Sequence, residues 1–285
     1  MRTVYRIPKF IAILVLIGIC IELYPYIIIN SDADILTQAE CYAMTKSTLM
    51  ESTGVDLYLI LNNIRWLFVL PVAILSRDML EIKVWQAIVI VFAFFLQITF
   101  GVIAIQGLED FFSTIGLPAI TMTGQYVYGT APLTILLAFV LAKIMKKNIW
   151  RTLDFIAPLW LINLVFVRLA CFTAGCCEVK ACNLIGIELV LPAQLLEVLL
   201  NLVLLQIIFN IESNRVKGQN TCIKEGNAFF IALGGHAVFR FLIDFMRDVP
   251  DLFLGMAFSQ VYSVVCIIIS TAVLVKLNET TKRED

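Results

Sequence analysis

Long apolar stretches separated by short polar segments run through most of the chain. A helix needs about 20 predominantly apolar residues to cross a bilayer. The pattern therefore predicts an all-α polytopic membrane protein with about eight transmembrane helices joined by short outer loops. The expected spans cover residues 9–30, 57–76, 84–106, 131–146, 155–173, 190–210, 227–247 and 254–275.

The composition agrees with this pattern. Of 285 residues, 60% are hydrophobic, whereas a soluble protein of this size is closer to half apolar. The net charge of -1 provides no basic surface, so nucleic-acid binding is excluded. We expect an N-terminal anchor helix in residues 1–30, an outer loop in 31–56, one membrane domain in 57–275 and a cytoplasmic tail in 276–285.

The positions of the basic residues predict the orientation, because Lys and Arg are enriched in cytoplasmic loops. With the N-terminus inside, 15 of the 21 Lys and Arg residues fall on the cytoplasmic side, and only Lys46 and Lys180 lie in outer loops. Both termini are therefore expected in the cytoplasm. The first span follows basic residues, as a signal peptide would, but it has no small-x-small cleavage site. An uncleaved anchor is the preferred interpretation.

Several ionisable residues stand in the apolar stretch 226–251, and four of them have helical spacing. His236, Arg240, Asp244 and Arg247 are spaced by four, four and three, so on a helix they fall within an arc of about 80°. Such groups inside a membrane span are costly and indicate function. A self-satisfied ladder of ion pairs is the alternative. One carboxylate cannot neutralise two guanidiniums, however, so the surplus charge predicts an anionic ligand, either carboxylate or phosphate.

A second polar set opens the span 190–210. Gln194 and Glu197 are spaced to share one helix face with Asn201. A buried glutamate requires a cation, which an arginine of another span could supply. Arg168, near the outer end of the fifth span, is one such arginine. We expect a pocket in the outer half of the membrane, lined by Arg168, Arg240, Arg247, Asp244, Glu197, Gln194 and His236.

Three further residues are weaker candidates. Arg65 lies several residues inside the second span, although an arginine near a helix end can simply extend to the interface. Tyr128 supplies a hydroxyl in a Gly- and Pro-containing loop, but it could equally belong to an aromatic belt. Gln260 is the one strongly polar residue near the outer end of the last span.

Four cysteines follow the fifth span with the spacing C-x4-C-C-x4-C: Cys171, Cys176, Cys177 and Cys182. This spacing matches no zinc knuckle. We expect neither a metal nor another cofactor. On the outer face, a disulfide between Cys182 and either Cys176 or Cys177 is one interpretation. A reactive thiol favoured by the nearby Arg168 is the other.

From about residue 57 onwards the chain resembles the prolipoprotein diacylglyceryl transferases of bacteria. Each matching segment is short, but their order and spacing fit the family and agree with the predicted topology. The segments are IRW (64–66), GQYVYG (124–129), DFIAPL (154–159), Arg168 within VRLACFTAG, PAQLLE (192–197), VFRFLIDFMRDVPD (238–251) and SQVYS (259–263).

The resemblance implies a multi-pass protein of the bacterial cytoplasmic (inner) membrane with a site that faces the outer leaflet. It also implies transfer of the diacylglyceryl group of phosphatidylglycerol, or a similar anionic phospholipid, to a cysteine thiol of a protein or peptide acceptor. Arg168 matches the family's signature arginine, and Arg240 and Arg247 match the arginines of its late helix. Asp244 stands where the family has glutamate.

The chain also departs from the family around the expected acceptor. Leu67 replaces a tyrosine, Tyr128 replaces the histidine of an HGG turn, and Cys171 replaces an asparagine. His236 stands where the family usually has tyrosine, so it is the candidate substitute base. The Arg240 charge one turn away favours the neutral imidazole that a base requires.

Three hypotheses follow: a divergent diacylglyceryl transferase, a non-catalytic lipid- or peptide-binding subunit of a maturation system, and a thiol-redox protein that uses the four cysteines. We prefer the transferase. Its expected catalytic residues are Arg168, Arg240, His236 and Tyr128, and its expected substrate-binding residues are Arg247, Asp244, Glu197, Gln194, Cys171, Arg65 and Gln260.

Overall fold

The computed structural model describes residues 57–114, 126–174, 182–184, 187–189, 193–216, 224–247, 251–253 and 255–279. The predicted first span, the outer loop 31–56 and the end of the tail lie outside these residues. Cys176 and Cys177 also lie outside them, so the predicted disulfide and the thiol-redox hypothesis stay predictions.

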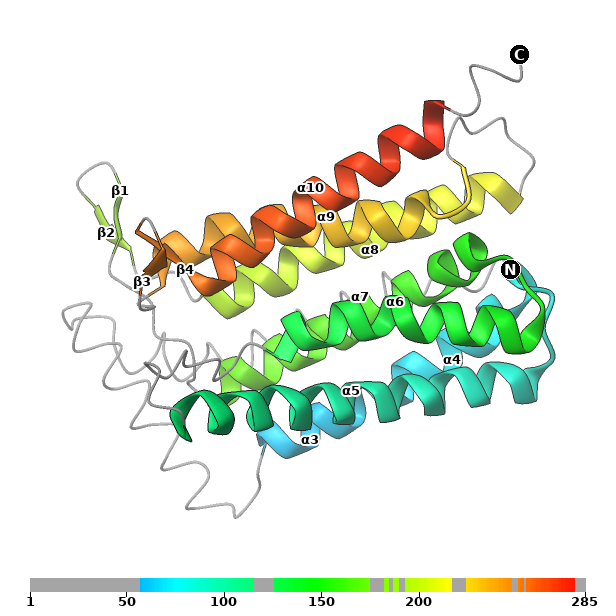
Figure 1. The fold of residues 1–285 in the computed structure, drawn as a ribbon, viewed down its shortest axis with the longest axis horizontal. Helices are drawn as coiled ribbons and strands as arrows, with labels where there is room; N and C mark the ends of the chain where they lie inside the picture. The colour runs from blue at the N-terminus through cyan, green and yellow to red at the C-terminus, as the bar shows by residue number, and fades with distance from the viewer. Residues whose placement is uncertain are drawn as a thin grey trace.

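The described part is a bundle of long helices with two short hairpins at one end (Figure 1). The hairpins are antiparallel pairs, β1 with β2 and β3 with β4. We call the end that carries them the hairpin end. The elements are α3 (Leu57–Ile64), α4 (Trp66–Ser76), η2 (Arg77–Met79), α5 (Val84–Thr114), α6 (Tyr126–Met145), α7 (Ile149–Ala174), β1 (Cys182–Leu184), β2 (Ile187–Leu189), α8 (Ala193–Val216), α9 (Asn227–Ile243), η3 (Asp244–Met246), β3 (Asp251–Phe253), β4 (Met256–Ala257) and α10 (Phe258–Glu279).

Seven of the eight predicted spans correspond to helices of the described part. Five segments are long and apolar enough to cross a membrane, and two shorter apolar helices accompany them. The prediction of a helical multi-pass membrane protein is therefore confirmed, whereas the count of eight and the side of the termini stay predictions. The five segments are Ile60–Met79, Val84–Gly101, Ile149–Phe172, Ala193–Arg215 and Ser259–Glu279, and the shorter helices are Thr130–Met145 and Asn227–Ile243.

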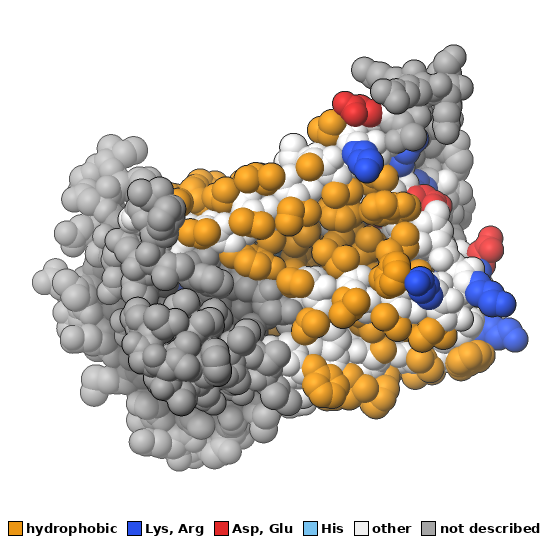
Figure 2. All heavy atoms as spheres, viewed as in Figure 1, with side chains coloured by type: hydrophobic (Ala, Val, Ile, Leu, Met, Phe, Trp, Pro, Cys, Tyr) orange, Lys and Arg blue, Asp and Glu red, His pale blue; other side chains and the backbone are white. Residues whose placement is uncertain are grey.

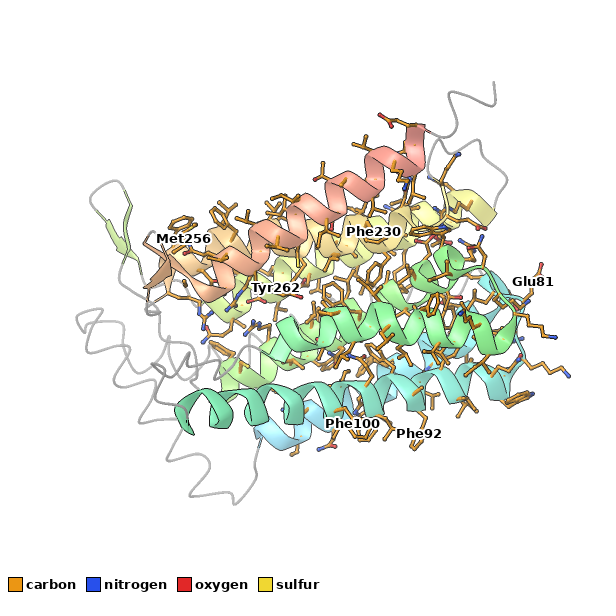
Figure 3. All side chains as sticks on the ribbon, in the orientation of Figure 1. Glu81, Phe92, Phe100, Phe230, Met256 and Tyr262 are labelled. Atoms are coloured by element: carbon orange, nitrogen blue, oxygen red, sulfur yellow. The ribbon has the colours of Figure 1, made fainter. Side chains whose placement is uncertain are left out.

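The surface of the bundle fits this interpretation. Phe92 and Phe100 project from α5 away from the other helices and are 61% and 63% exposed (Figure 3). Apolar side chains cover the flank of the bundle, and charged side chains gather at the end opposite the hairpins (Figure 2). In water such a continuous apolar surface would promote aggregation, whereas in a bilayer it contacts lipid chains.

Helix α7 forms the centre of the bundle. In its span, 89% of the residues are buried, against 22% in the spans Ile60–Met79 and Ser259–Glu279. It contacts α3, α4, α6, α8 and α9. A helix that is apolar on every side is expected to be buried among other helices. Groups placed on α7, such as Arg168, are therefore held away from both lipid and water.

The predicted ends of two spans are wrong where 84–106 is followed by 131–146, because α5 continues to Thr114 and α6 already begins at Tyr126. Gly129 and Pro132 suggested a turn. A tertiary contact instead supports the helix here, because the Gln97 side chain of α5 donates to the Thr130 carbonyl at 2.9 Å. Within α6, the Thr134 hydroxyl also donates to that carbonyl at 2.8 Å. Local glycine and proline signals are overridden here by packing.

Two adjacent glycines let α9 approach both of its neighbours. A Cβ added to Gly235 would lie 2.6 Å from Leu204 Cδ2 of α8, and one added to Gly234 would lie 3.0 Å from Ser270 Cβ of α10. Small residues allow helices in a membrane to pack at short distance. The close packing fixes the position of His236, the next residue on α9.

The start of α9 is fixed by Gly226 and Asp154. Gly226 has φ +91°, and a Cβ there would lie 2.8 Å from Trp150 Cε3. The buried Asp154 carboxylate of α7 accepts hydrogen bonds from the N–H groups of Gly226 at 2.8 Å and Phe229 at 3.1 Å. A carboxylate at a helix N-terminus also interacts favourably with the helix dipole.

We expect Gly226→Ala to lower the free energy of unfolding by about 2 to 4 kcal/mol, since left-handed strain adds to overpacking against Trp150. Gly255→Ala is the matched control. Gly255 also has positive φ, +72°, but a Cβ there would meet nothing within 4 Å. Gly255→Ala should therefore lower the free energy of unfolding by only about 1 to 2 kcal/mol. Thermal unfolding in detergent measures both, and equal losses would contradict the packing role of Gly226.

Candidate functional site

Five buried charged residues form a continuous chain of ion pairs near the hairpin end, which we call the arginine ladder: Arg168, Glu197, Arg240, Asp244 and Arg247. Its centre is Glu197 of α8. Glu197 Oε1 lies 2.7 Å from Arg168 Nε of α7, and Oε2 lies 2.8 Å from Arg240 Nη1 of α9. Each carboxylate oxygen thus binds a different guanidinium, and one side chain joins three helices.

The second half of the ladder runs through Asp244. Its Oδ1 lies 3.1 Å from Arg240 Nη2 and 2.8 Å from Arg247 Nη1. The side chains are almost fully buried, and Arg247, the most accessible, is 9% exposed. The structure thus brings Arg168, Glu197, Arg240, Asp244 and Arg247 together in one place. The expected shared helix face is wrong for Arg247, because α9 ends at Ile243 and Arg247 is extended, with φ -100° and ψ 150°.

The ladder carries a surplus positive charge. Among these five described residues, three guanidiniums face two carboxylates, so the ladder itself has a formal surplus of one positive charge. Guanidiniums bind carboxylate and phosphate with paired hydrogen bonds. The arrangement is therefore suited to an anion with one negative charge.

His236 lies beside the ladder on α9. Its Nδ1 is 2.9 Å from Asn201 Oδ1, and its Nε2 is 4.0 Å from Glu197 Oε1. The Asn201 Nδ2 group donates to the Glu197 backbone carbonyl at 2.8 Å. The imidazole also packs edge-on against Trp160, with ring centroids 5.4 Å apart. Three helices thus hold the ring in one orientation.

A narrow cavity opens next to this imidazole, with room for about one water molecule. His236 and Arg240 of α9 form one side of it, and Tyr262 and Ser263 of α10 form another. Tyr262 is labelled on α10 in Figure 3. Because Arg240 belongs to both the ladder and the cavity lining, the two features are parts of one site.

The other predicted site residues have different surroundings. Gln194 is buried on α8 one turn before Glu197. Gln260 braces the start of α10, since its Oε1 accepts from Ala257 N at 2.9 Å and its Nε2 donates to the Phe241 carbonyl at 3.5 Å. Cys171 is half-buried on α7, one turn beyond Arg168. The backbone of Tyr128 lies in α6, but its side chain is outside the described part.

Two contacts of Arg65 are local. It donates to Asn62 Oδ1 at 3.2 Å and lies over the Trp66 ring, 4.9 Å from the ring centroid. These contacts occupy the guanidinium within the α3–α4 segment. They fit the stacking that arginine favours on aromatic rings and do not join Arg65 to the ladder.

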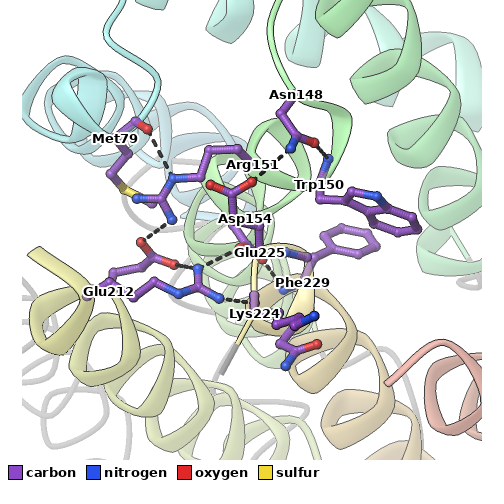
Figure 4. A network of polar contacts seen from close by, with 12 residues as sticks. Met79, Asn148, Trp150, Arg151, Asp154, Glu212, Lys224, Glu225 and Phe229 are labelled. Atoms are coloured by element: carbon purple, nitrogen blue, oxygen red, sulfur yellow. Dashed lines mark hydrogen bonds and ion pairs between the residues drawn. The ribbon is translucent and has the colours of Figure 1, made fainter. Parts of the chain in front are cut away.

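A second buried network lies near the other end of α7, and sequence reasoning missed it (Figure 4). Arg151 Nη1 pairs with Glu212 at 2.7 Å, and Arg215 Nη1 pairs with Asp154 at 2.6 Å and with Glu212 at 2.5 Å. Two guanidiniums face two carboxylates, so this network is neutral. It joins α7 to α8 and to the start of α9, and we interpret it as structural.

Sequence reasoning noted Asn201 only as a neighbour of Glu197 on one helix face. The spacing of four from Glu197 was the signal that could have placed it in the site. Tyr262 and Ser263 lie in the SQVYS segment of the resemblance, but no spacing in the last span indicates that they face α9. In the part of the chain that the structure describes, no group of three or more His, Cys, Asp or Glu residues is placed to hold a metal ion.

Residues 68–276 match the family model described as prolipoprotein diacylglyceryl transferase. This range includes every residue of the ladder together with His236 and Asn201. The search of curated proteins found no match.

We expect Glu197→Gln to destabilise the protein by about 3 to 5 kcal/mol, because two buried guanidiniums lose their shared carboxylate. Glu212→Gln is the matched control. In that variant Arg215 keeps Asp154, and the network carries one surplus charge rather than the two left in the ladder by Glu197→Gln. Unfolding in detergent should show a clearly smaller loss for Glu212→Gln, and an equal or larger loss would contradict the central place of Glu197.

Proposed function

The chain belongs to the prolipoprotein diacylglyceryl transferase family, and from this premise we propose which substrates it uses and which residues act. The donor is phosphatidylglycerol or a similar anionic phospholipid. The acceptor is the thiol of a cysteine in a protein or peptide. The surplus positive charge of the arginine ladder is the observation that carries this proposal.

The ladder binds the donor's phosphate. A phosphodiester has one negative charge, which equals the surplus charge of the three guanidiniums and two carboxylates. Arg168, Arg240 and Arg247 provide planar donors that suit phosphate oxygens. Glu197 and Asp244 orient the guanidiniums, as their distances of 2.7 to 3.1 Å to the arginine nitrogens indicate.

The same groups assist the reaction itself. A base takes the thiol proton, and the sulfur attacks the carbon of the diacylglyceryl group that is bonded to a phosphate ester oxygen. The carbon–sulfur bond forms as the carbon–oxygen bond breaks, and the electron pair stays on the phosphate of the departing glycerol phosphate. The phosphate thereby gains negative charge, so buried guanidiniums stabilise the transition state more than the bound donor.

The remaining predicted residues have secondary roles in this proposal. We assign Gln194 of α8 and Cys171 of α7, which lie one turn from Glu197 and Arg168, to the surroundings of the bound headgroup. Gln260 sets the position of α10 against α9. Arg65 and Tyr128 lie on α3–α4 and α6, and we assign them contacts with the rest of the lipid. As the positions of the Lys and Arg residues predict, the site faces the outer leaflet of a bacterial inner membrane.

A non-catalytic lipid- or peptide-binding subunit is the second candidate. It is favoured by the replacements around the acceptor: Leu67 for tyrosine, Tyr128 for histidine and Cys171 for asparagine. Purified protein is incubated with labelled phosphatidylglycerol and a lipobox peptide, which is a peptide that carries the acceptor cysteine of a prolipoprotein. This experiment distinguishes the two candidates. Thioether product supports the transferase, whereas lipid binding without product supports the subunit.

We expect Arg240→Lys to lower the rate of transfer by about 10²- to 10³-fold, because lysine cannot reproduce a fork of donors on the developing charge. Transfer to a lipobox peptide is measured in nanodiscs that contain phosphatidylglycerol. Membrane insertion of the variant is checked by extraction and thermal unfolding.

Arg151→Lys provides the matched control. Its guanidinium is also held by a glutamate, Glu212 at 2.7 Å, and by the Met79 carbonyl at 3.1 Å, but in the neutral network. That variant should transfer at close to the wild-type rate. Wild-type turnover in Arg240→Lys would exclude the phosphate-binding role of the ladder.

A further inference from the structure

A single polar atom beside the ladder has chemistry that phosphate binding does not use: Nε2 of His236. We propose that Nε2 accepts the proton of the acceptor thiol, and that Asn201 is a positioning residue that fixes the required tautomer. This inference rests on the proposed transfer reaction and names the acceptor side of the same site.

The hydrogen bonds determine the tautomer. Asn201 Nδ2 donates to the Glu197 backbone carbonyl at 2.8 Å, so the amide must turn its oxygen toward His236. That oxygen, Oδ1, lies 2.9 Å from Nδ1. An amide oxygen only accepts, so Nδ1 carries the hydrogen. In the neutral ring the lone pair is then on Nε2, which is the form that a base needs.

The position of Nε2 suits this role. His236 is 4% exposed, and Nε2 has no hydrogen-bond partner within the described part of the chain. The ring lines the cavity that Arg240, Tyr262 and Ser263 also line. A thiol that enters this cavity meets the imidazole on the side that Arg240 shares with the phosphate site. The acceptor thiol and the donor phosphate would therefore lie on either side of Arg240, which belongs to both the cavity and the ladder.

The charges around the ring are mixed. Glu197 of α8 places a carboxylate oxygen 4.0 Å from Nε2, and this carboxylate stabilises the imidazolium that forms when the thiol proton arrives. The positive charges of Arg168 of α7 and Arg240 of α9 destabilise the imidazolium. From α10, Tyr262 and the thiol of Cys266 line the same cavity. The imidazolium is therefore short-lived and releases its proton to water or to the glycerol phosphate as the product leaves.

The chain has a single histidine, which permits a direct measurement of the tautomer. Protein labelled with 15N-histidine and placed in nanodiscs should show a hydrogen-bearing Nδ1 and an unprotonated Nε2 at neutral pH. Asn201→Leu should lose this preference and give a mixture of tautomers. Asn210→Leu, on the exposed face of the same helix, is the control and should keep the wild-type spectrum.

Turnover provides the second readout. We expect His236→Gln to lower kcat by about 10²- to 10⁴-fold, the range of general-base catalysis. Its affinity for fluorescent phosphatidylglycerol should not change. Asn201→Leu should lower kcat about tenfold or more for the same reason. Asn201→Asp should recover most of that loss, because its carboxylate still accepts from Nδ1–H. In the pH profile of kcat for Asn201→Asp, the acid limb should move to higher pH, because the introduced carboxylate favours the imidazolium.

The outcomes separate this inference from the proposed function. A wild-type spectrum with hydrogen on Nε2, or full kcat in His236→Gln, overturns the base role while transfer by the protein stands. Full kcat in Asn201→Leu overturns the positioning role. A wild-type protein that binds phosphatidylglycerol and transfers nothing to any thiol peptide overturns the proposed function, and the base role with it.

Discussion

The site depends on one shared carboxylate. Glu197 gives one oxygen to Arg168 of α7 and the other to Arg240 of α9, both at less than 3 Å. Its backbone carbonyl holds Asn201, and its side chain faces the imidazole of His236. A glutamate buried in a membrane protein is costly by itself. The two guanidiniums offset this cost, and in return they are held at a fixed spacing from which an anion can be bound.

The two polar networks along α7 show how charge balance distinguishes structure from function. Arg168 and Arg151 are 17 residues apart, or about 25 Å along the helix. Around Arg151, two guanidiniums face two carboxylates, and Asp154 also holds the start of α9 (Figure 4). Around Arg168 a third guanidinium, that of Arg247, is added. The neutral network joins helices, and we propose that the charged one binds an anion.

Much of this arrangement could be predicted from the chain because residue spacing and charge are local properties. The spans followed from apolar length, and the spacing of His236, Arg240 and Asp244 placed them on one helix face. The end of α9 at Ile243 was harder to predict from the sequence. Arg247 contacts Asp244 from an extended backbone, although its spacing would also fit a continued helix. The Asp154 network was missed because it joins residues about 60 positions apart, and no local pattern indicates such a pairing.

The central claim is that the surplus charge of the ladder binds a lipid phosphate, and a structure determined with bound phosphatidylglycerol tests it most directly. The account predicts the lipid phosphorus within about 4 Å of guanidinium nitrogens from Arg168 and Arg240, with Arg247 adjoining. A headgroup bound elsewhere, with the ladder closed around Glu197 and Asp244 alone, would contradict it.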